Sequence, residues 1–187
     1  RGDGNLSVAL VTFGNRAYDN ALAELVGLME DGGMRPIGAA AMVTRHVFSD
    51  TLGASRPNEE DVSALEDFAT KVSEKILSSS NDKISALKVP GETHPDKYYT
   101  PLKTTNVPAS FLKAKPSCDI ERCSRCGKCV GICPMGSIEV EDGVPVFNGV
   151  SIKCQACRLG CPNEAIAFAH PDYHSHIAMI EQNFSSP

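Results

Sequence analysis

The first 80 residues show two different spacings of apolar positions. Residues 6–12 form a short apolar run rich in β-branched side chains, and Gly14 and Asn15 follow it, which predicts a buried strand and then a tight loop. From Asn20 onward, apolar residues recur at helical spacing until the glycine pair that begins at Gly32. The pattern therefore predicts a strand, a loop and a helix in this order.

A second strand and a second helix extend this region. Residues 36–43 are small and apolar, residues 44–58 show no period, and residues 59–77 carry a strong amphipathic stripe. Parallel strands joined by a covering helix belong to layered α/β sheets, whose two faces must both be covered. A doubly wound domain has about five or six strands. Residues 1–80 are therefore predicted to be about half of such a domain.

The rest of this sheet would either precede Arg1 or come from another chain. The sequence begins with Arg, not Met, and enters a strand pattern within a few residues. We therefore expect the chain to be a piece of a longer protein. The missing N-terminal half of the sheet is an expected partner.

Residues 81–116 contain several prolines and lysines and have little periodicity, which predicts a linker. Basic and acidic residues number 6 and 3 over residues 81–117, whereas they number 7 and 12 before this segment and 5 and 8 after it. A basic connector thus joins two acidic modules. The predicted order is an α/β domain in residues 1–80, a linker in residues 81–116, a small α+β domain in residues 117–170 and a tail in residues 171–187.

Hydropathy excludes a membrane-spanning protein, and the charge balance argues against a nucleic-acid-binding one. No apolar run approaches the ~20 residues needed to cross a bilayer. The 187 residues contain 18 Lys and Arg against 23 Asp and Glu, for a formal net charge of -5. Nucleic-acid-binding proteins usually present a basic surface. Neither a membrane span nor a nucleic-acid partner is predicted.

All eight cysteines lie between Cys118 and Cys161, so the metal or redox chemistry belongs to the last third of the chain. An even number of cysteines also fits a disulfide framework, but the chain shows no signal peptide. Thiols three residues apart suit a shared metal better than mutual pairing. We therefore expect a reducing, cytoplasmic setting.

Four of these cysteines form a C-x2-C-x2-C-x3-C-P run, from Cys123 to Cys133 and Pro134. Three thiolates on one tight loop can wrap one side of an iron–sulfur cube, and the fourth points to a different cluster. The same frame returns from residue 151 to Pro162, at a constant offset of 28 residues. The duplication predicts two related halves, each with a β-hairpin, a short helix and cluster ligands.

The crossed arrangement of this motif divides the ligands into two sets. The first set is Cys123, Cys126, Cys129 and Cys161, and the second is Cys133, Cys154 and Cys157 with Ser151 in the fourth position.

The sequence leaves several alternatives for the fourth ligand of the second site. Ser151 could bind as an alkoxide, a harder donor than thiolate, Cys118 could swing in, or an external thiol could bind. Loss of one iron would instead leave a three-iron cluster. Cys118, five residues ahead of the motif, can also be a spare thiol.

Different parts of the chain resemble two different protein families. Residues 118–168 resemble a bacterial-type two-cluster [4Fe-4S] ferredoxin, which implies one-electron transfer at low potential. Residues 6–77 resemble the C-terminal half of a flavodoxin-like domain. The chain resembles the flavodoxin–ferredoxin fusions found mainly in anaerobic bacteria at residues 12–19, His46 and residues 55–57. The chain departs from that family at Phe13, where Tyr is usual, at Ser151, and in the absent first half.

The flavodoxin-like resemblance implies an FMN site. The phosphate of FMN would bind an early Thr/Ser-rich loop at a helix N-terminus, and this chain has no such loop. The loop that flanks the flavin ring remains. The implied flavin-binding residues are Thr12, Phe13, Gly14, Asn15, Arg16 and Tyr18. The alternative is that these residues form only a strand-to-helix turn.

The histidines have weaker patterns. His46 could be a proton donor or a neighbour of the flavin, although a lone loop histidine is more often structural. His170, His174 and His176, with Asp172 between them, could bind a metal. They lack a sharp ligand spacing, so we favour a solvated helix or coil for this tail.

These patterns predict an electron-transfer protein that carries single electrons through [4Fe-4S] clusters and exchanges them with redox partner proteins, coupled to FMN in the full-length protein. No nucleophile or acid–base pair stands out, so an enzyme is not assigned. One alternative is a flavin-dependent oxidoreductase with a built-in ferredoxin relay. Another is a structural zinc module, because paired C-x2-C motifs also bind Zn²⁺.

Overall fold

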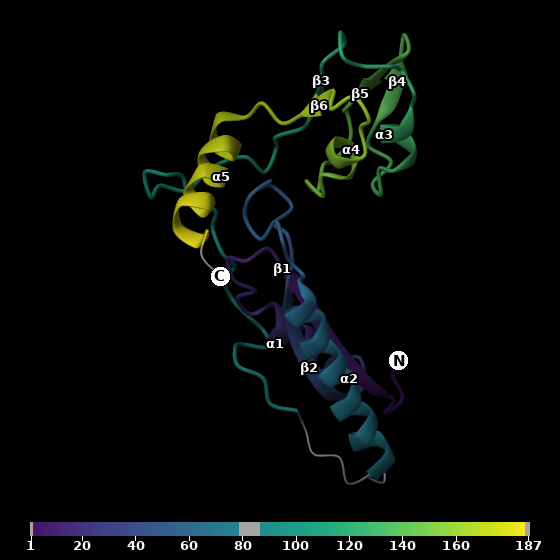
Figure 1. The fold of residues 1–187 in the computed structure, drawn as a ribbon, viewed down its shortest axis with the longest axis vertical. Helices are drawn as coiled ribbons and strands as arrows, with labels where there is room; N and C mark the ends of the chain where they lie inside the picture. Colours follow the sequence, from purple (N-terminus) through teal and green to yellow (C-terminus); the bar gives the residue numbers. More distant parts are fainter. Residues whose placement is uncertain (1, 79–86, 186–187) are drawn as a thin grey trace. The chain divides into compact units, whose positions relative to one another are not determined.

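The computed structural model describes residues 2–78 and 87–185, which belong to two compact units (Figure 1). One unit comprises Arg1–Tyr99 with Phe184–Pro187, and the other comprises Thr100–Asn183. The boundary therefore lies inside the segment 81–116 that the sequence predicts as a linker. From Thr100 onward, this segment is part of the second unit.

The first unit contains a parallel two-stranded sheet. Strand β1 (Leu6–Phe13) pairs with β2 (Arg35–Val43) from Leu6 opposite Arg35 to Phe13 opposite Val43, with one irregularity between Ser7 and Val8. Helix α1 (Ala21–Asp31) connects the two strands, and helix α2 (Glu59–Ser78) follows β2. These four elements lie where the spacing of apolar residues predicts them.

The two helices pack on opposite faces of this sheet. On one face, Ala9 of β1 packs in a buried core with Leu22 and Val26 of α1. On the other face, α2 lies directly on β2, because a Cβ on Gly38 would come within 2.8 Å of Val72 and 3.1 Å of Phe68. Residues of a strand alternate between the two faces, so helical cover on both sides is typical of an α/β layer.

The second unit contains two small antiparallel sheets and two one-turn helices. Strand β3 (Ser117–Cys118) pairs with β6 (Ile166–Ala167), and β4 (Glu139–Glu141) pairs with β5 (Val144–Val146). Helix α3 (Lys128–Gly131) lies in the first motif and α4 (Ala156–Leu159) in the second.

Only one of the two predicted hairpins is present in this part of the second unit. Strands β4 and β5 form a hairpin, whereas β3 and β6 come from the two ends of the cysteine-containing region. Pairing between these ends closes the region on itself.

The predicted solvated tail is a packed helix instead. Helix α5 (Pro171–Phe184) buries Tyr173, His176, Met179 and Ile180. The Tyr173 ring lies 5.7 Å from Phe111 and 5.0 Å from Phe168, measured between ring centroids. Both partners are distant in sequence, so the periodicity of the tail alone does not reveal the surface that covers its apolar face.

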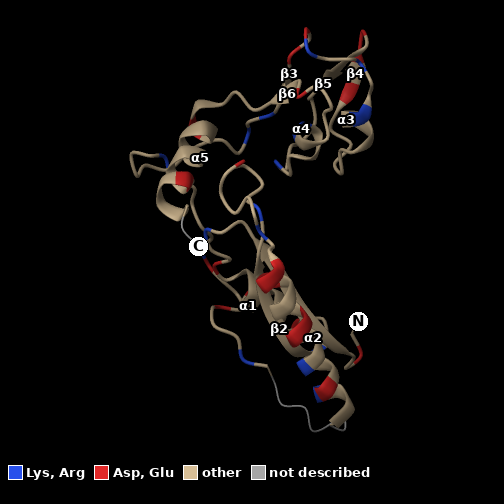
Figure 2. Ribbon diagram, viewed as in Figure 1, with Lys and Arg blue, Asp and Glu red and all other residues tan. Residues whose placement is uncertain are grey.

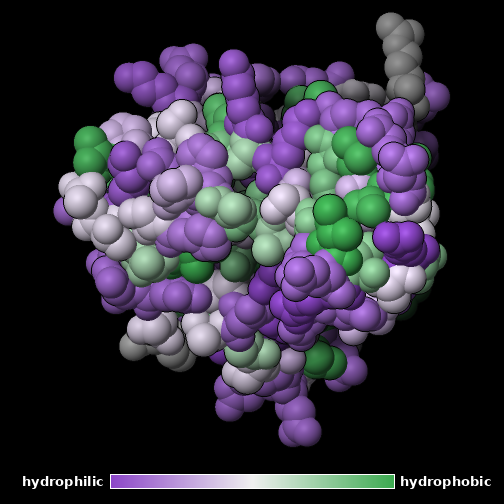
Figure 3. All heavy atoms as spheres, turned by 90° about the horizontal axis from the view of Figure 1, so that it is seen from above, coloured by the Kyte–Doolittle hydropathy of each residue, from purple (hydrophilic) through white to green (hydrophobic). Residues whose placement is uncertain are grey.

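None of the helices within residues 2–78 and 87–185 is long and apolar enough to cross a membrane. The surface seen in Figure 3 is mainly hydrophilic, with separate apolar patches. Such patches can mark sites of interaction with other molecules.

Candidate metal centres

The first cavity in the second unit is lined by cysteines from both motifs. Cys123, Cys126 and Cys129 come from the loop and the first turn at α3, and Cys161 comes from the segment that follows α4. The structure therefore brings together the four residues of the first predicted ligand set. Cys161 is 32 to 38 positions away in sequence from the other three cysteines, and it shares their cavity because the two halves of the region pack against each other.

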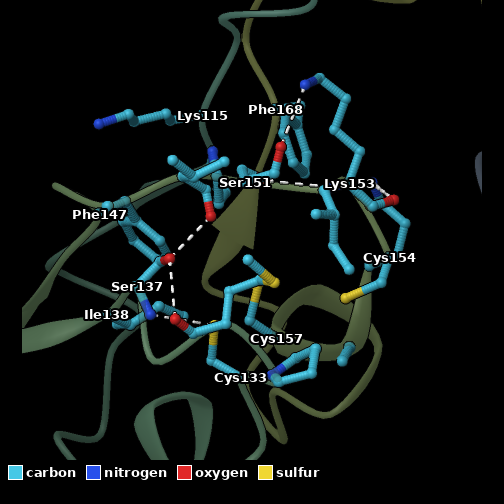
Figure 4. A pocket seen from close by; sticks show the side chains of 18 residues that line it. Lys115, Cys133, Ser137, Ile138, Phe147, Ser151, Lys153, Cys154, Cys157 and Phe168 are labelled. Carbon is cyan, nitrogen blue, oxygen red and sulfur yellow. Dashed lines mark hydrogen bonds between the residues drawn. The ribbon is translucent and has the colours of Figure 1, made fainter.

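The second cavity contains the other predicted set. Cys133, Cys154, Cys157 and Ser151 lie around it (Figure 4). The two cavities have the same free volume, about 30 Å³ each. The serine in the second motif has therefore not caused its cavity to collapse.

Equivalent backbone hydrogen bonds hold one sulfur in each motif. The N–H of Ser137 donates to Cys133 Sγ at 3.4 Å, and the N–H of Ala165 donates to Cys161 Sγ at 3.3 Å. The two donors and the two acceptors are each related by the 28-residue offset. Hydrogen bonds from N–H groups stabilise the negative charge of a thiolate and are a means of tuning iron–sulfur centres.

Ser151 occupies the same local geometry as its cysteine counterpart. The N–H of Arg125 donates to Cys123 Sγ at 3.4 Å, and the N–H of Lys153 donates to Ser151 Oγ at 3.3 Å. The hydroxyl thus stands where the first motif places a thiol. This is the position that the sequence predicts for the fourth ligand of the second set.

The loops that carry the cysteines share an unusual backbone. Arg125 and Lys153 have φ angles of 58° and 57°, and Gly127 and Gln155 have φ angles of 71° and 62°. Left-handed conformations at non-glycine residues are strained. Sequence reasoning missed Gln155, which is 1% exposed with its Oε1 unpaired among the described residues. The 28-residue offset, which aligns it with Gly127, could have found it.

The surroundings shift the acidity of several thiols. Burial raises the pKa of Cys129 and of Cys157, whereas the backbone N–H of Lys128 is the main cause that lowers the pKa of Cys126. Because thiolates are the metal-binding form, a bound cation must offset the cost of desolvating the buried ones. Soft thiolate donors around a cavity, with N–H groups aimed at sulfur, fit an iron–sulfur cluster.

Cys118 lies beside the first set of cysteines. Burial is the main cause that raises its pKa to about 11, and the neighbouring Cys123, Cys129 and Cys161 add to the shift. Cys118 is paired with Ile166 across β3 and β6 and is not among the residues that line the second cavity. Its position therefore gives no support to the idea that it completes the second ligand set.

The predicted flavin-binding residues lie at the end of β1 and in the loop that follows it, but they contact other protein groups. Phe13 and Tyr18 pack edge to face at 5.3 Å between ring centroids. The Arg16 guanidinium lies 3.7 Å from the centroid of the Tyr99 ring and pairs with Asp19.

Three further members of this set have distinct surroundings. Asn15 Nδ2 donates to the carbonyl of Phe184 at 2.9 Å, and Thr12 is exposed. A Cβ on Gly14 would lie 2.7 Å from the Cα of His46, so contact with His46 requires glycine there. Packing within the protein therefore explains Gly14 without a flavin.

Two histidines of the tail contact backbone groups. His176 Nδ1 lies 2.8 Å from the Leu102 carbonyl, and His170 Nδ1 accepts a hydrogen bond from the N–H of Asp172. Within the described ranges, no three His, Cys, Asp or Glu side chains are placed to hold a single metal ion. The cysteines accordingly surround two cavities and do not converge on one point.

Comparison with known proteins identifies an iron–sulfur motif in this region. Residues 119–139 match the 4Fe-4S binding domain family. The chain is 37% identical over 57 residues to an uncharacterized ferredoxin of Methanocaldococcus jannaschii, a match that covers 28% of this chain and 39% of the ferredoxin. It is 42% identical over 52 residues to the DNA-directed RNA polymerase subunit Rpo3 of Methanosarcina mazei, covering 27% of this chain and 20% of the subunit.

The chain thus contains a ferredoxin-like 4Fe-4S binding domain. It spans less than two fifths of the length of the first relative and one fifth of the second. The matches concern about a quarter of the chain in each case, so the iron–sulfur region is the part that these relatives share.

The crossed ligand sets predict different iron contents for two double variants. Cys123→Ala with Cys161→Ala removes two ligands from the first cavity and leaves the second set complete, so the chain should keep about four iron. Cys123→Ala with Cys133→Ala removes one ligand from each set and should leave less iron than that. Iron analysis after anaerobic reconstitution measures both, and the reverse order would contradict crossed ligation.

The position of Ser151 predicts a gain from a restored thiol. Ser151→Cys should lengthen the lifetime of the second cluster in air by about tenfold, because thiolate is a better ligand for iron–sulfide than a serine oxygen. Visible absorbance during air exposure measures this lifetime. Ser110→Cys, outside both cavities, should have no effect. An unchanged lifetime in Ser151→Cys would mean that residue 151 does not face the cluster.

Proposed function

We propose that residues 117–170 form an electron carrier with one [4Fe-4S] cluster in each cavity. The observation that carries this proposal is the lining of each cavity by cysteines from both motifs. When bound, such a cluster accepts and donates one electron at a time. The match of residues 119–139 to the 4Fe-4S binding domain family supports the same chemistry.

The protein supplies ligands, insulation and electrostatic tuning. Ile138, Gln155, Ala165 and Ile166 are nearly completely buried in this unit and exclude water from its interior. The N–H groups that donate to sulfur favour the added negative charge of a reduced cluster and therefore raise the reduction potential. Electron transfer needs no proton donor or nucleophile at this site.

The geometry favours clusters over a structural zinc ion. A zinc site brings four ligands to within about 2.3 Å of one ion when they are thiolates. No three candidate ligands among the described residues are placed around one ion in this way. Cavities of equal volume bounded by thiols support a polynuclear cluster in each.

This function predicts how many electrons the chain takes up. Titration of the anaerobically reconstituted chain with a low-potential reductant should consume about two electrons per chain, one for each cluster. Bleaching of the visible absorbance measures the uptake. An iron-loaded chain that takes up no electrons, or a colourless chain loaded with zinc, would contradict the proposal.

We further propose that the first unit is part of a flavodoxin-like domain that binds FMN in the full-length protein. Thr44 N–H donates to the Phe13 carbonyl, so the loops after β1 and β2 are adjacent at the carboxyl ends of parallel strands. Ligands of open α/β sheets bind at such edges. Val8 and Leu10 of β1 are 39% and 43% exposed, as expected for a sheet that further strands and helices would complete.

The flavin proposal has its own test. A polypeptide that adds the remaining strands to this chain should retain FMN, and Tyr18→Ala should weaken its binding about tenfold by removing an aromatic partner. Quenching of flavin fluorescence measures the affinity. Absence of flavin in that polypeptide would contradict the proposal. Turnover of a specific acceptor by the flavin-loaded protein would favour the alternative, a flavin-dependent oxidoreductase with a ferredoxin relay.

A further inference from the structure

Three large apolar side chains are exposed beside the second cavity. Leu112 is 85% exposed, Val150 is 69% exposed and Ile152 is 56% exposed. Val150 and Ile152 flank Ser151 in sequence, and both belong to the residues that line the cavity. Single exposed apolar residues are common on protein surfaces, whereas a cluster of them can mark an interaction site. These three side chains form such a cluster at the edge of a candidate redox centre.

Two lysines join the segments that carry these side chains. Lys153 Nζ donates to the carbonyl of Leu112, and Lys115 Nζ donates to the carbonyl of Asn148. Residues 112–115 therefore lie alongside residues 148–153. Leu112, Val150 and Ile152 belong to one face with Lys115 and Lys153. Lys113 is exposed in the same segment as Leu112 and Lys115, and we term these six residues the lysine face.

The charge of the lysine face is not neutralised. Within residues 2–78 and 87–185, the ion pairs include Lys103 with Asp172 and Arg122 with Glu164, but no carboxylate lies within 4.0 Å of an ammonium group of the lysine face. Glu139 lies near this face. Its carboxylate accepts a hydrogen bond from Asn148 Nδ2 at 2.7 Å, and the carbonyl of the same Asn148 accepts one from Lys115 Nζ.

Acidic residues gather elsewhere in the same unit. They lie next to the first motif and in the turn between β4 and β5, where red segments are visible in Figure 2. They are Asp119, Glu121, Glu141 and Asp142. Arg122, Arg125 and Lys128 belong to the same part of the unit and partly offset this negative charge, whereas the lysine face belongs to other segments.

We propose that the lysine face docks a redox partner protein with an acidic surface, which exchanges electrons through the second cavity. This inference rests on the proposed electron-carrier function and adds the place and the charge of the partner. Three ammonium groups match acidic side chains, and the central apolar residues supply contact area. A small mixed patch suits a short-lived redox encounter, since such interfaces lie at the low end of buried area.

The test measures electron transfer to two probe proteins of opposite charge. The reconstituted full chain is reduced with dithionite, freed of excess reductant and mixed in a stopped-flow instrument with oxidised acidic rubredoxin or with basic cytochrome c. Each event oxidises the chain by one electron and reduces one ferric iron of the probe to ferrous. The second-order rate constant is followed from low to high salt.

The wild-type rate constant for rubredoxin should fall about tenfold as salt screens the attraction. Lys113→Glu with Lys115→Glu should lower the rate constant at low salt by at least about tenfold. Lys113→Gln with Lys115→Gln should have a smaller effect in the same direction. Lys88→Glu with Lys97→Glu, an equal charge change in the first unit, should leave it within about twofold.

Two further measurements separate docking from other effects. Leu112→Ser should lower the rate constant for rubredoxin at high salt, where only the apolar contact remains. The reversed lysine pair should not slow reduction of cytochrome c, because that probe carries the opposite charge. Equal slowing with both probes, or an unchanged rate constant with rubredoxin, would overturn the docking proposal.

Failure of this inference differs from failure of the carrier function. A chain that holds iron and reduces both probes at rates independent of the lysine face is still a carrier, but it lacks this docking site. A chain that takes up no electrons fails at the earlier step. The iron content of every variant, measured before mixing, excludes loss of the clusters as the cause of a lower rate.

Discussion

The crossed placement of two cysteines, each lining the cavity of the other motif, is the constraint on which the second unit depends. Cys161 belongs to the second motif but lines the first cavity, and Cys133 belongs to the first motif but lines the second. Neither half can complete a site alone, and a region of this size buries too little apolar surface to be stable without cross-links. Bound clusters would supply them, and cluster binding would then be coupled to folding.

The two halves keep the backbone of the site and vary its side chains. Arg125 and Lys153 share a left-handed conformation and the same N–H hydrogen bond, although one donates to sulfur and the other to a hydroxyl. Gln155 keeps the left-handed conformation of Gly127. With the serine oxygen, a harder donor, as its fourth ligand, the proposed second cluster would be less stable than the first.

Local patterns predicted the elements of the first unit and the residues around the two cavities. The 28-residue offset and the motif spacing were sufficient to assign Cys161 and Cys133 to opposite sets, because ligation by this motif is crossed. The packing of α5 was not predictable in this way. Its apolar face is covered by Phe111 and Phe168, and no short-range period relates these residues to the helix. The contact between Gly14 and His46 is likewise a tertiary one.

The most direct measurement is the iron and acid-labile sulfide content of the anaerobically reconstituted chain, together with the EPR spectrum of its reduced form. Two clusters predict about eight iron and about eight sulfide per chain, and a spectrum broadened by magnetic interaction between two neighbouring reduced centres. About four of each would leave the Ser151 cavity without its cluster. No sulfide, with zinc in place of iron, would contradict the account of the whole unit.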